Sequence, residues 1–577
     1  MEREGYPRGG VKFDRTRVAE DASFTFLGSG EAGGKAAGLA FLKEALVGRF
    51  PGGSFRGLPV DIPRMSVLLT GVFEEFVASG GLRLEELADL SDEQIARHFQ
   101  KADLPVFLVG DLLALVSRVH NPLAVRSSSL QEDALYEPFA GVYATKMVPN
   151  NQPDAESRFR KLVEAVKFVY ASTWFRRARD YCLATGHPIG EERMGVIIQE
   201  VVGHRFRERF YPAVSGVARS YNYYPIGTCR REDGVAHLAL GLGKTIVEGG
   251  AAWYCCPAFP RTPPPYNSLR DLAKNTQTRY WAVNLGQSAE YDPTQENEHL
   301  VQGDLREAQA DGSLAQVCST WDPASDRLVM GLSGEGPRLL DFSPMLQGGL
   351  APLPELIVEL LALARERVGS EVEIEFAMAF DHQGGRPARF GFLQVRPMAV
   401  RRQAARLDGI AQERVLVRSS LVIGEGESGG IRHVVYVKPR AFAAEATGAI
   451  AAELAEVNAR LGRTPYLLIG FGRWGSADPW LGIPVAWSQI SGARAIVEGA
   501  LPEMSPEPSQ GSHFFHNLSG LGIPYFTVRA SDPEGIAWGA LEEMPVVEEL
   551  RYVRHVESPV ELRVLVDGRA GKGVIAR

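Results

Sequence analysis

The 577-residue sequence predicts a mixed α/β and α+β protein, because helical and strand patterns alternate along the whole chain. Apolar residues recur at helical spacing in three clear segments, 35–48, 105–118 and 355–368. Short β-branched segments bounded by glycine or polar turns occur at 195–202, 235–243, 371–380 and 389–395. At about 150 residues per domain, this length corresponds to about four structural units. We therefore expect several cores rather than one.

Composition and charge exclude some classes of function. Lys and Arg number 62 and Asp and Glu number 70, which gives a formal net charge of −8. The chain as a whole is therefore not built to bind nucleic acid or an anionic membrane, although a local basic cleft could hold a phosphorylated ligand. The five cysteines form no CxxC pair, which argues against a disulfide scaffold or a zinc ribbon. Because the N-terminus lacks an apolar leader and no stretch reaches the ~18 apolar residues of a membrane span, we expect a cytoplasmic protein.

The order of the elements suggests two domains. Residues 1–30 are polar and glycine-rich, and residues 156–180 predict one long amphipathic helix whose charges are typical of a solvated face. A polar connector at 401–414 precedes a new apolar segment, RVLVRSSLVIG. This change in composition predicts a domain boundary near 403–412. We expect a first domain of residues 1–403 and a smaller second domain of residues 404–577.

The glycine-rich segment GSGEAGGKAAGLA, residues 28–40, is the first candidate site. Its glycines allow the backbone to bend, and Lys35 follows where a helix would begin. Backbone N–H groups, the helix N-terminus and the lysine could together hold a phosphate. The spacing differs from a Walker A loop, since GxxxxGK[ST] is absent here. A flexible glycine turn with a surface lysine is the alternative interpretation.

The second candidate is LAVRSSSLQEDALYEPFAGVYAT, residues 123–145. A short apolar strand runs into Arg126, three serines and two acidic residues. The planar guanidinium of Arg126 suits phosphate oxygens. Alternatively, Arg126 is structural and pairs with Glu132 or Asp133.

The third candidate combines AVSGVARS, residues 213–220, with LALGLGKTIVEGG, residues 238–250. Each segment is interpreted as a strand followed by a glycine-bearing turn. Such turns could fold over a triphosphate, or they could be ordinary hairpin turns.

The fourth candidate is EVEIEFAMAFDHQGGRPARFGFLQVRPM, residues 371–398. Glu371, Glu373 and Glu375 alternate, so on a strand they share one face. These carboxylates repel one another unless a cation lies beside them, and Mg²⁺ prefers such oxygen ligands and bridges nucleotide phosphates. The hairpin returns with Gln394 and Arg396, again on one face. A solvated strand edge is the alternative, although the apolar residues between the glutamates indicate that the opposite face is packed.

Taken together, these segments resemble the ATP-grasp nucleotide-binding region of phosphoenolpyruvate synthase and pyruvate phosphate dikinase, over approximately residues 20–400. The shared motifs occur in family order and are GGKAAGL, AVRSSSLQED, FAGVY, VIIQEVV, SGVA, GLGKTIVEGG, EIEFA and LQVRPM. Eight motifs in one order are far more specific than any single glycine pattern. The resemblance implies that this region binds ATP.

The resemblance also implies roles for individual residues. Phosphate contacts would come from Lys35 and Arg126, and the phosphate-transfer site would be completed by Gln394 and Arg396, with Arg126 and Arg396 catalytic. Mg²⁺ and the nucleotide would be held by Glu373 and Glu375.

The same resemblance implies which segments contact the nucleotide. The backbone of residues 199–202, beginning at Gln199, would meet the adenine, while Gly216 and the 241–243 turn with Gly243 would lie over the phosphates. One departure is Lys244, which stands where the family usually has Glu. It reverses a charge beside the phosphates and leaves the role of this loop open.

The second domain resembles the family's swivelling phosphohistidine domain, a smaller β/α unit, but less closely. Ser512-His513 is followed by the sequence LGIP, residues 521–524, at the family's spacing. A neutral imidazole is a good nucleophile near pH 7, so His513 would take a phosphoryl group from ATP. A swinging domain would then carry that group to a second site.

Several departures leave two roles open for His513. The family's GG-x-T is replaced by PSQG, residues 508–511, and the expected later arginine is Ser519. His516 lies three residues after His513 and therefore on the same side of a helix. His513 is either a phosphocarrier or a structural residue hydrogen-bonded to Ser512. His433 is a weaker rival carrier.

We therefore expect an ATP-dependent dikinase-type phosphotransferase that uses ATP and Mg²⁺ to phosphorylate a carrier histidine and then an acceptor. By the resemblance, the acceptor would be water, a small alcohol, a glycan or an antibiotic; no nucleic-acid or membrane partner is expected, and a homodimer is compatible. The chain ends at residue 577, soon after Pro524, which leaves no room for the ~250-residue pyruvate barrel of the named enzymes. Pyruvate would have to bind to a separate chain. An inactive ATP-binding regulatory protein is the alternative that the altered histidine motif favours.

Overall fold

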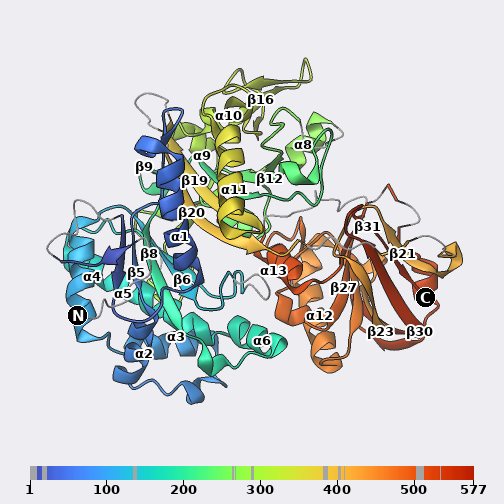
Figure 1. The fold of residues 1–577 in the computed structure, drawn as a ribbon. Coiled ribbons are helices and arrows are strands. Elements are labelled where there is room, and N and C mark those ends of the chain that lie inside the picture. Colours follow the sequence, from blue (N-terminus) through green and yellow to red (C-terminus); the bar gives the residue numbers. More distant parts are fainter. Residues whose placement is uncertain are drawn as a thin grey trace.

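The computed structural model describes most of the chain, namely residues 10–15, 23–133, 139–262, 266, 268–287, 291–380, 387–400, 405–407, 410–501, 512–529, 531–532 and 535–577. Within it we distinguish an N-terminal lobe (up to residue 200), a central lobe (201–400) and a C-terminal unit (405–577), as Figure 1 shows. The mixed α/β class is confirmed. The predicted boundary at 403–404 falls within residues 401–404, outside the described residues.

The N-terminal lobe surrounds a sheet of six strands with helices. The strand order is β1 (Val11–Lys12), β2 (Phe24–Leu27), β5 (Met65–Leu68), β8 (Met194–Glu200), β6 (Leu123–Ser129) and β7 (Thr145–Val148). The longer helices of the lobe are α1 (Gly34–Arg49), α2 (Thr70–Ser79), α3 (Asp92–Lys101), α4 (Val106–Arg118), α5 (Ala155–Ala171) and α6 (Arg176–Thr185). The helices predicted at 35–48 and 105–118 are thus confirmed as α1 and α4.

The single long helix predicted at 156–180 is wrong, because the chain forms α5 and α6 with a break between them. The hydroxyls of Ser172 and Thr173 donate to the carbonyls of Val169 and Tyr170, both at 2.7 Å. Such local bonds compete with helix hydrogen bonds. At Phe175 the backbone is extended, with φ −63° and ψ 154°, and α6 begins at the next residue.

A seven-stranded sheet joins the N-terminal and central lobes. Its order is β13 (Trp253–Cys255), β12 (Val235–Ala239), β11 (Val214–Arg219), β19 (Glu371–Phe380), β20 (Pro387–Met398), β4 (Leu58–Asp61) and β3 (Ser54–Phe55). The predicted hairpin of residues 371–398 is the β19–β20 pair at its centre. Helix α11 (Leu353–Val368) packs against β19, as its predicted apolar periodicity at 355–368 requires.

Smaller elements complete the central lobe. One sheet has the order β15 (Leu300–Asp304), β14 (Arg279–Asn284), β10 (Arg209–Tyr211) and β9 (His204–Phe206), and another has β17 (Arg327–Met330), β16 (Cys318–Asp322) and β18 (Arg338–Leu340). The helices are α7 (Lys244–Val247), α8 (Leu269–Asn275), α9 (Leu305–Ala310) and α10 (Ser343–Leu346).

The C-terminal unit is built on a nine-stranded sheet whose β23, β24, β27 and β28 run parallel. Its order is β21 (Val415–Ser419), β31 (Lys572–Ala576), β30 (Val553–Asp567), β23 (Gly426–Val437), β24 (Tyr466–Phe471), β27 (Ala493–Gly499), β28 (Tyr525–Val528) and β22 (Val422–Ile423), with β29 (Val546–Glu549) beside β30. The remaining elements are α12 (Thr447–Leu461), α13 (His513–Leu521), α14 (Trp538–Glu542) and the pair β25 (Arg473–Trp474) and β26 (Gly482–Ile483).

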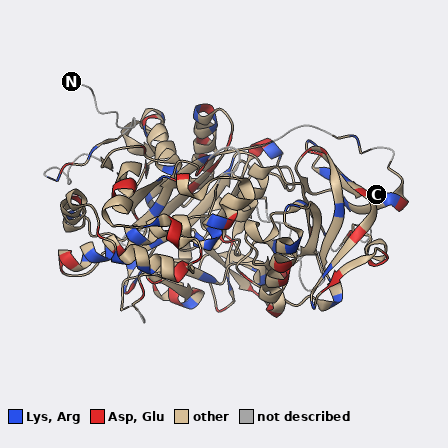
Figure 2. Cartoon of the chain, turned by 90° about the horizontal axis from the view of Figure 1, so that it is seen from below, with Lys and Arg blue, Asp and Glu red and all other residues tan. Residues whose placement is uncertain are grey.

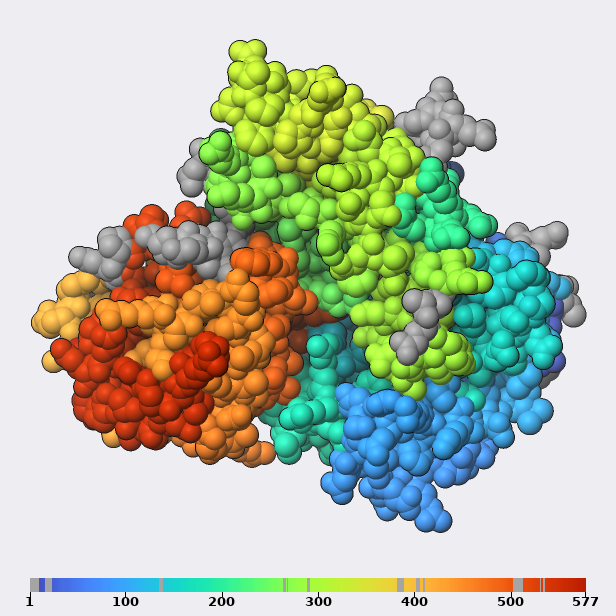
Figure 3. Space-filling view, turned by 180° about the vertical axis from the view of Figure 1, so that it is seen from behind, coloured from blue at the N-terminus to red at the C-terminus, as the bar shows by residue number. Residues whose placement is uncertain are grey.

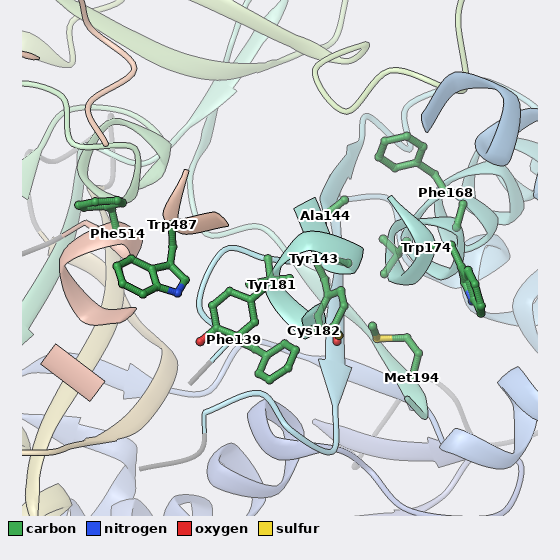
Figure 4. Packing of buried hydrophobic residues seen from close by; sticks show 14 of the residues in the cluster. Phe139, Tyr143, Ala144, Phe168, Trp174, Tyr181, Cys182, Met194, Trp487 and Phe514 are labelled. Atoms are coloured by element: carbon green, nitrogen blue, oxygen red, sulfur yellow. The ribbon is translucent and has the colours of Figure 1, made fainter. Parts of the chain in front are cut away.

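The C-terminal unit packs against both other lobes, as the space-filling view of Figure 3 shows. One apolar cluster runs through the contact, and Figure 4 shows Phe139 and Tyr181 of the N-terminal lobe with Trp487 and Phe514 of the C-terminal unit. A separate core lies within the C-terminal sheet. Acidic and basic residues are interspersed over the chain in Figure 2. None of the helices in the described part is long and apolar enough to cross a membrane.

Candidate active site

Arg126 joins the N-terminal lobe to the seven-stranded sheet. It lies on β6, and its guanidinium donates to the Leu393 carbonyl at 3.1 Å and to the Gln394 side-chain oxygen at 2.6 Å. A third bond, of 3.2 Å, reaches a carboxylate oxygen of Glu375. The guanidinium is thus held between two lobes.

Lys35, at the start of α1, faces the same region. Its ammonium group pairs with the buried carboxylate of Glu132 and lies 3.2 Å from the Ser127 hydroxyl. The preceding Gly33 has φ +76°, and a Cβ atom there would lie 1.6 Å from the Ser128 carbonyl oxygen. The glycine turn therefore serves close packing, and a surface lysine is the wrong interpretation because the Lys35 side chain is only 13% exposed.

Two arginines clamp a glutamate at the centre of the sheet. Arg219 on β11 and Arg396 on β20 pair with opposite oxygens of Glu373 on β19 between them. The Glu373 side chain is 0% exposed. Burial opposes its ionisation, but the two guanidinium groups outweigh that effect and lower the pKa of Glu373.

Asp133 completes this group beside Gln394 and Arg396. The Gln394 amide donates to both carboxylate oxygens of Asp133, at 2.9 and 2.7 Å, and an Arg396 nitrogen lies 3.9 Å away. Burial raises the pKa of Asp133 to about 6. The connected set, which we call the ion-pair cluster, consists of Lys35, Arg126, Glu132, Asp133, Arg219, Glu373, Glu375, Gln394 and Arg396.

Glu373 and Glu375, the two expected magnesium ligands, are not equally available to a metal ion. Glu373 does not fit, because both of its oxygens accept from guanidinium groups and the side chain has no exposed surface. Glu375 keeps 14% of its side chain exposed while it bonds Arg126 and Arg396. Among the described residues, no three His, Cys, Asp or Glu side chains gather as a metal site. The cations that offset the carboxylates of β19 in this structure are arginines.

The C-terminal unit brings His513 to the ion-pair cluster. His513 is the first residue of α13, a helix that contacts β20 and is drawn between the sheet and the C-terminal unit in Figure 1. Its Nε2 lies 4.0 Å from Glu375 Oε1, and its side chain is 30% exposed. Ser512 caps this helix by accepting from the Phe515 N–H at 3.2 Å.

A second histidine and an asparagine of α13 face the same surface. His516 Nδ1 lies 3.9 Å from Glu373 Oε2, so the predicted common side of His513 and His516 is confirmed. The Asn517 side chain accepts from the Ala140 N–H at 3.0 Å and donates to the Ala140 carbonyl at 2.8 Å. At the adjacent Gly141, φ is +65° and a Cβ atom would lie 2.4 Å from the His513 ring. Residues of the FAGVY motif therefore pack directly against α13.

The residues expected around the nucleotide lie outside the ion-pair cluster. Gln199 is buried in β8 and its amide contacts the Met65 sulfur at 3.9 Å. The next N–H groups, of Glu200 and Val201, donate to the carbonyls of Arg64 and Pro122. Those two donors are therefore used within the protein, and the adenine contact predicted for 199–202 stays a prediction.

The interpretation of the SGVA segment as a turn is wrong. Gly216 lies within β11 opposite Phe376, and a Cβ atom there would lie 2.0 Å from the Phe376 ring. This glycine therefore accommodates an aromatic ring of the neighbouring strand. Its predicted place over the phosphates is not tested by this packing.

The 241–243 turn does follow a strand, as predicted. Gly241 has φ +81°, and Gly243 precedes α7. Lys244 pairs with Glu248 and lies 5.7 Å from the centre of the Trp281 ring. The charge that departs from the family pattern is thus compensated one helical turn away.

Sequence patterns missed several members of the site. Short-range patterns do not identify Arg219, although a buried arginine at the end of a largely apolar strand requires a buried partner. The sequence offers Glu132 and Asp133 as partners of Arg126, but in the structure they bond Lys35 and Gln394 instead. Asn517 carried no recognisable signal, since its partner Ala140 is distant in the sequence.

Replacing Asn517 by alanine is expected to weaken the contact between α13 and Ala140. The change leaves the buried Ala140 N–H and carbonyl without these partners, at about 1–3 kcal/mol. Amide hydrogen exchange at Ala140 should become faster. Asn150→Ala is a matched control, because buried Asn150 also bonds backbone carbonyls, of Val119 and Asn121, away from α13. Unchanged exchange at Ala140 in the Asn517 variant would contradict the assigned contact.

Comparison with known proteins agrees with this geometry. The family model for the pyruvate phosphate dikinase AMP/ATP-binding domain matches residues 29–415, more than half of the chain and every member of the ion-pair cluster. No curated protein matches the chain. The match supports ATP binding and a dikinase-type, ATP-utilising enzyme. The chain belongs to the family of the pyruvate phosphate dikinase AMP/ATP-binding domain.

Proposed function

We propose that the protein is an ATP-dependent dikinase-type phosphotransferase in which His513 carries the phosphoryl group. One observation carries the proposal: His513 Nε2 lies 4.0 Å from Glu375 Oε1, inside the group that also contains Lys35, Arg126 and Arg396. A histidine of the C-terminal unit thus lies beside a carboxylate that pairs with cationic side chains of the other two lobes. Such a nucleophile beside phosphate-binding cations is what phosphoryl transfer requires.

The ion-pair cluster can exchange carboxylates for phosphates. Lys35, Arg126 and Arg396 each pair with an acidic side chain, and an incoming triphosphate offers them stronger acceptors of the same sign. Mg²⁺ would enter as part of the nucleotide substrate. In the transition state these fixed cations stabilise the charge that develops on the leaving oxygen.

An apolar cluster beside the 241–243 turn offers a binding surface for the adenine. Leu242 and Phe210 are buried there, and Val201 and Trp281 are partly buried against them. Val201 belongs to the segment predicted to meet the adenine, and Leu242 belongs to the turn predicted to lie over the phosphates. Their shared cluster supports one nucleotide site that spans both segments.

His513 is suited to act as the nucleophile. Burial and the neighbouring Arg396 charge hold the pKa of His513 well below its ordinary value, so the imidazole is neutral near pH 7. Its lone pair on Nε2 can form the bond to phosphorus while the bond from phosphorus to the leaving oxygen breaks. His516 is 5% exposed and therefore less accessible to a nucleotide.

Acidification is expected to release the C-terminal unit. Burial also lowers the pKa of His516, so both histidines are less basic in the docked arrangement than when exposed to water. The docked state is therefore fully favoured above pH 6.5 and loses stability below it, by up to about 1.4 kcal/mol per pH unit and histidine. Asp133, whose pKa is raised to about 6, opposes this trend at lower pH by binding a proton in the folded state.

Small-angle scattering between pH 7.5 and 6 would measure this release as an increase in the radius of gyration. The His516→Asn variant should show a shallower dependence, because one of the two titrating rings is gone. A radius that decreases on acidification would contradict the prediction.

The proposed function is tested by phosphorus NMR of the products formed from ATP. AMP together with phosphate or pyrophosphate supports a dikinase, whereas ADP indicates a simple kinase. Tight binding of ATP without any consumption would overturn the proposal in favour of an ATP-binding regulatory protein. Adding pyruvate, small alcohols and glycans in turn would identify the acceptor, including one that needs a separate pyruvate-binding chain.

A further inference from the structure

The face of the seven-stranded sheet that carries the ion-pair cluster continues toward the C-terminal unit. Residues that pair directly on neighbouring strands project from the same face. One such row crosses β20, β19, β11, β12 and β13, and its members are Gln394, Glu375, Val217, His237 and Tyr254. Only β11 lies between β19 and β12, so about 10 Å separates the Glu375 and His237 positions. His237 therefore extends the row that begins in the ion-pair cluster.

His237 is a buried polar residue that the proposed reaction does not use. It is 3% exposed, and neither ring nitrogen has a hydrogen-bond partner among the described residues. Arg219, in the adjacent row of the same face, is 0% exposed; its Nη2 pairs with Glu373, whereas its Nη1 has no hydrogen-bond partner among the described residues. Two neighbouring buried groups thus have unused hydrogen-bonding capacity, which is uncommon in folded proteins.

The charges around His237 favour an anion. Arg219 and Arg473 are the cations that act on it, and Glu373 opposes them while it is shared with Arg396. Burial and these cations lower the pKa of His237 to about 3, so the ring is neutral and can donate one hydrogen bond without adding charge.

The C-terminal unit encloses this part of the sheet. Arg473 donates to the carbonyls of Gly249 and Gly250 at 3.2 Å each, and the Ser476 hydroxyl donates to Gly249 at 3.2 Å. Gly249 and Gly250 belong to the loop after α7 in the central lobe. In Figure 1, β12 lies on the side of the sheet toward the C-terminal unit. The surroundings of His237 are therefore completed by both units.

We infer that His237 and Arg219 form a phosphate-binding subsite, distinct from the carrier histidine and roofed by the segment around Arg473. The ligand is a phosphate oxyanion, either free inorganic phosphate or a phosphate of the bound nucleotide. The neutral ring donates to an oxygen and the guanidinium supplies charge and further donors. This inference relies on the proposed function only for the choice between those two sources.

Calorimetric titration of the full chain with inorganic phosphate, ATP and AMP tests the subsite. The key variant is His237→Phe, which keeps an aromatic ring against Tyr254, whose ring centre is 5.6 Å away, but removes both nitrogens. We expect phosphate or ATP to bind at least about tenfold more weakly, with AMP unchanged. Weaker binding of free phosphate alone identifies the free anion as ligand, and weaker binding of ATP alone identifies the nucleotide.

Wild-type affinity of His237→Phe for both phosphate and ATP would overturn the inference and leave a packing role for the ring. His237→Gln restores a donor and should recover part of the affinity. His555→Phe, at another buried histidine, controls for general effects on folding. Should His237→Phe not fold, the Arg219→Lys variant must weaken the same ligand. Phosphate binding that depends on His237 without any ATP consumption would uphold the subsite while refuting the proposed function.

Discussion

Replacing His513 by alanine is expected to abolish acid-labile labelling of the protein by ATP and to lower turnover at least about 10³-fold. His513 is partly exposed at the ion-pair cluster, whereas the neighbouring His516 is only 5% exposed, so we do not expect His516 to take over the bond to phosphorus. The experiment uses ATP labelled separately in the β and γ positions, followed by measurement of label retained on the protein. The retained position also identifies the phosphoryl group that is transferred.

Two other histidines provide controls for this variant. His516→Asn removes the buried ring near Glu373 and should keep the label. His433→Ala alters the weaker rival, which lies on β23 and contacts His555 at 3.0 Å between ring nitrogens, and it should also keep the label. Equal labelling of wild type and His513→Ala would remove the carrier assignment, and loss of label only in the His433 variant would transfer the role to that residue.

Replacing Arg396 by alanine is expected to cost about 3–5 kcal/mol of folding free energy as well as phosphoryl transfer. Arg396 is 1% exposed and pairs with Glu373 at 2.5 Å and with Glu375 at 3.1 Å. Without it, two carboxylates lie side by side on β19 with Arg219 and Arg126 as the remaining cations. Denaturant unfolding should show the loss, and it should be smaller at low pH, where the carboxylates are protonated.

Arg389 offers a matched control on the same strand. It pairs with Asp61 at 2.9 Å, but both side chains are substantially exposed, so Arg389→Ala should cost less than about 1 kcal/mol. Arg396→Lys keeps the positive charge but loses the bidentate guanidinium. Its stability should lie between those of the wild type and Arg396→Ala, and its phosphoryl transfer should be slow. Similar stability of the Arg396 and Arg389 alanine variants would show that the central ion pairs contribute little.

Local sequence patterns located the elements of the nucleotide-binding region well. The helix that carries Lys35 and the strands that carry Arg126 and Glu373 were all predicted, because their periodicities reflect which face is buried. The break between α5 and α6 does not show in the sequence pattern. It depends on the hydrogen bonds of the Ser172 and Thr173 hydroxyls, and the helical spacing of apolar residues continues almost unchanged across it. Gly216 was misplaced for a related reason, because a glycine within a strand and a glycine in a turn look alike without the partner strand.

Glu373 and Glu375 show a second limit of prediction from sequence. Alternation on β19 correctly placed Glu373 and Glu375 on one face, and correctly required a cation beside them. It did not identify that cation. Arg219 and Arg396 occupy positions on two neighbouring strands, and their approach to Glu373 depends on strand order and register, which short-range patterns do not contain.

The sequence by itself determined the order of motifs, the residue types that can hold phosphates, and a histidine at the start of a C-terminal helix. Only the tertiary structure decided that His513 lies beside Glu375 and that Asn517 hydrogen-bonds Ala140. It also decided that His237 lies in the same cross-strand row of the sheet as Glu375. The physical reason is that motif chemistry is local, whereas the contacts of His513 and Asn517 join residues more than a hundred positions apart, and the row that links His237 to Glu375 exists only once β11 pairs with both β12 and β19. Such contacts are set by strand pairing and by the packing of one unit on another, so they emerge only when the whole chain is folded.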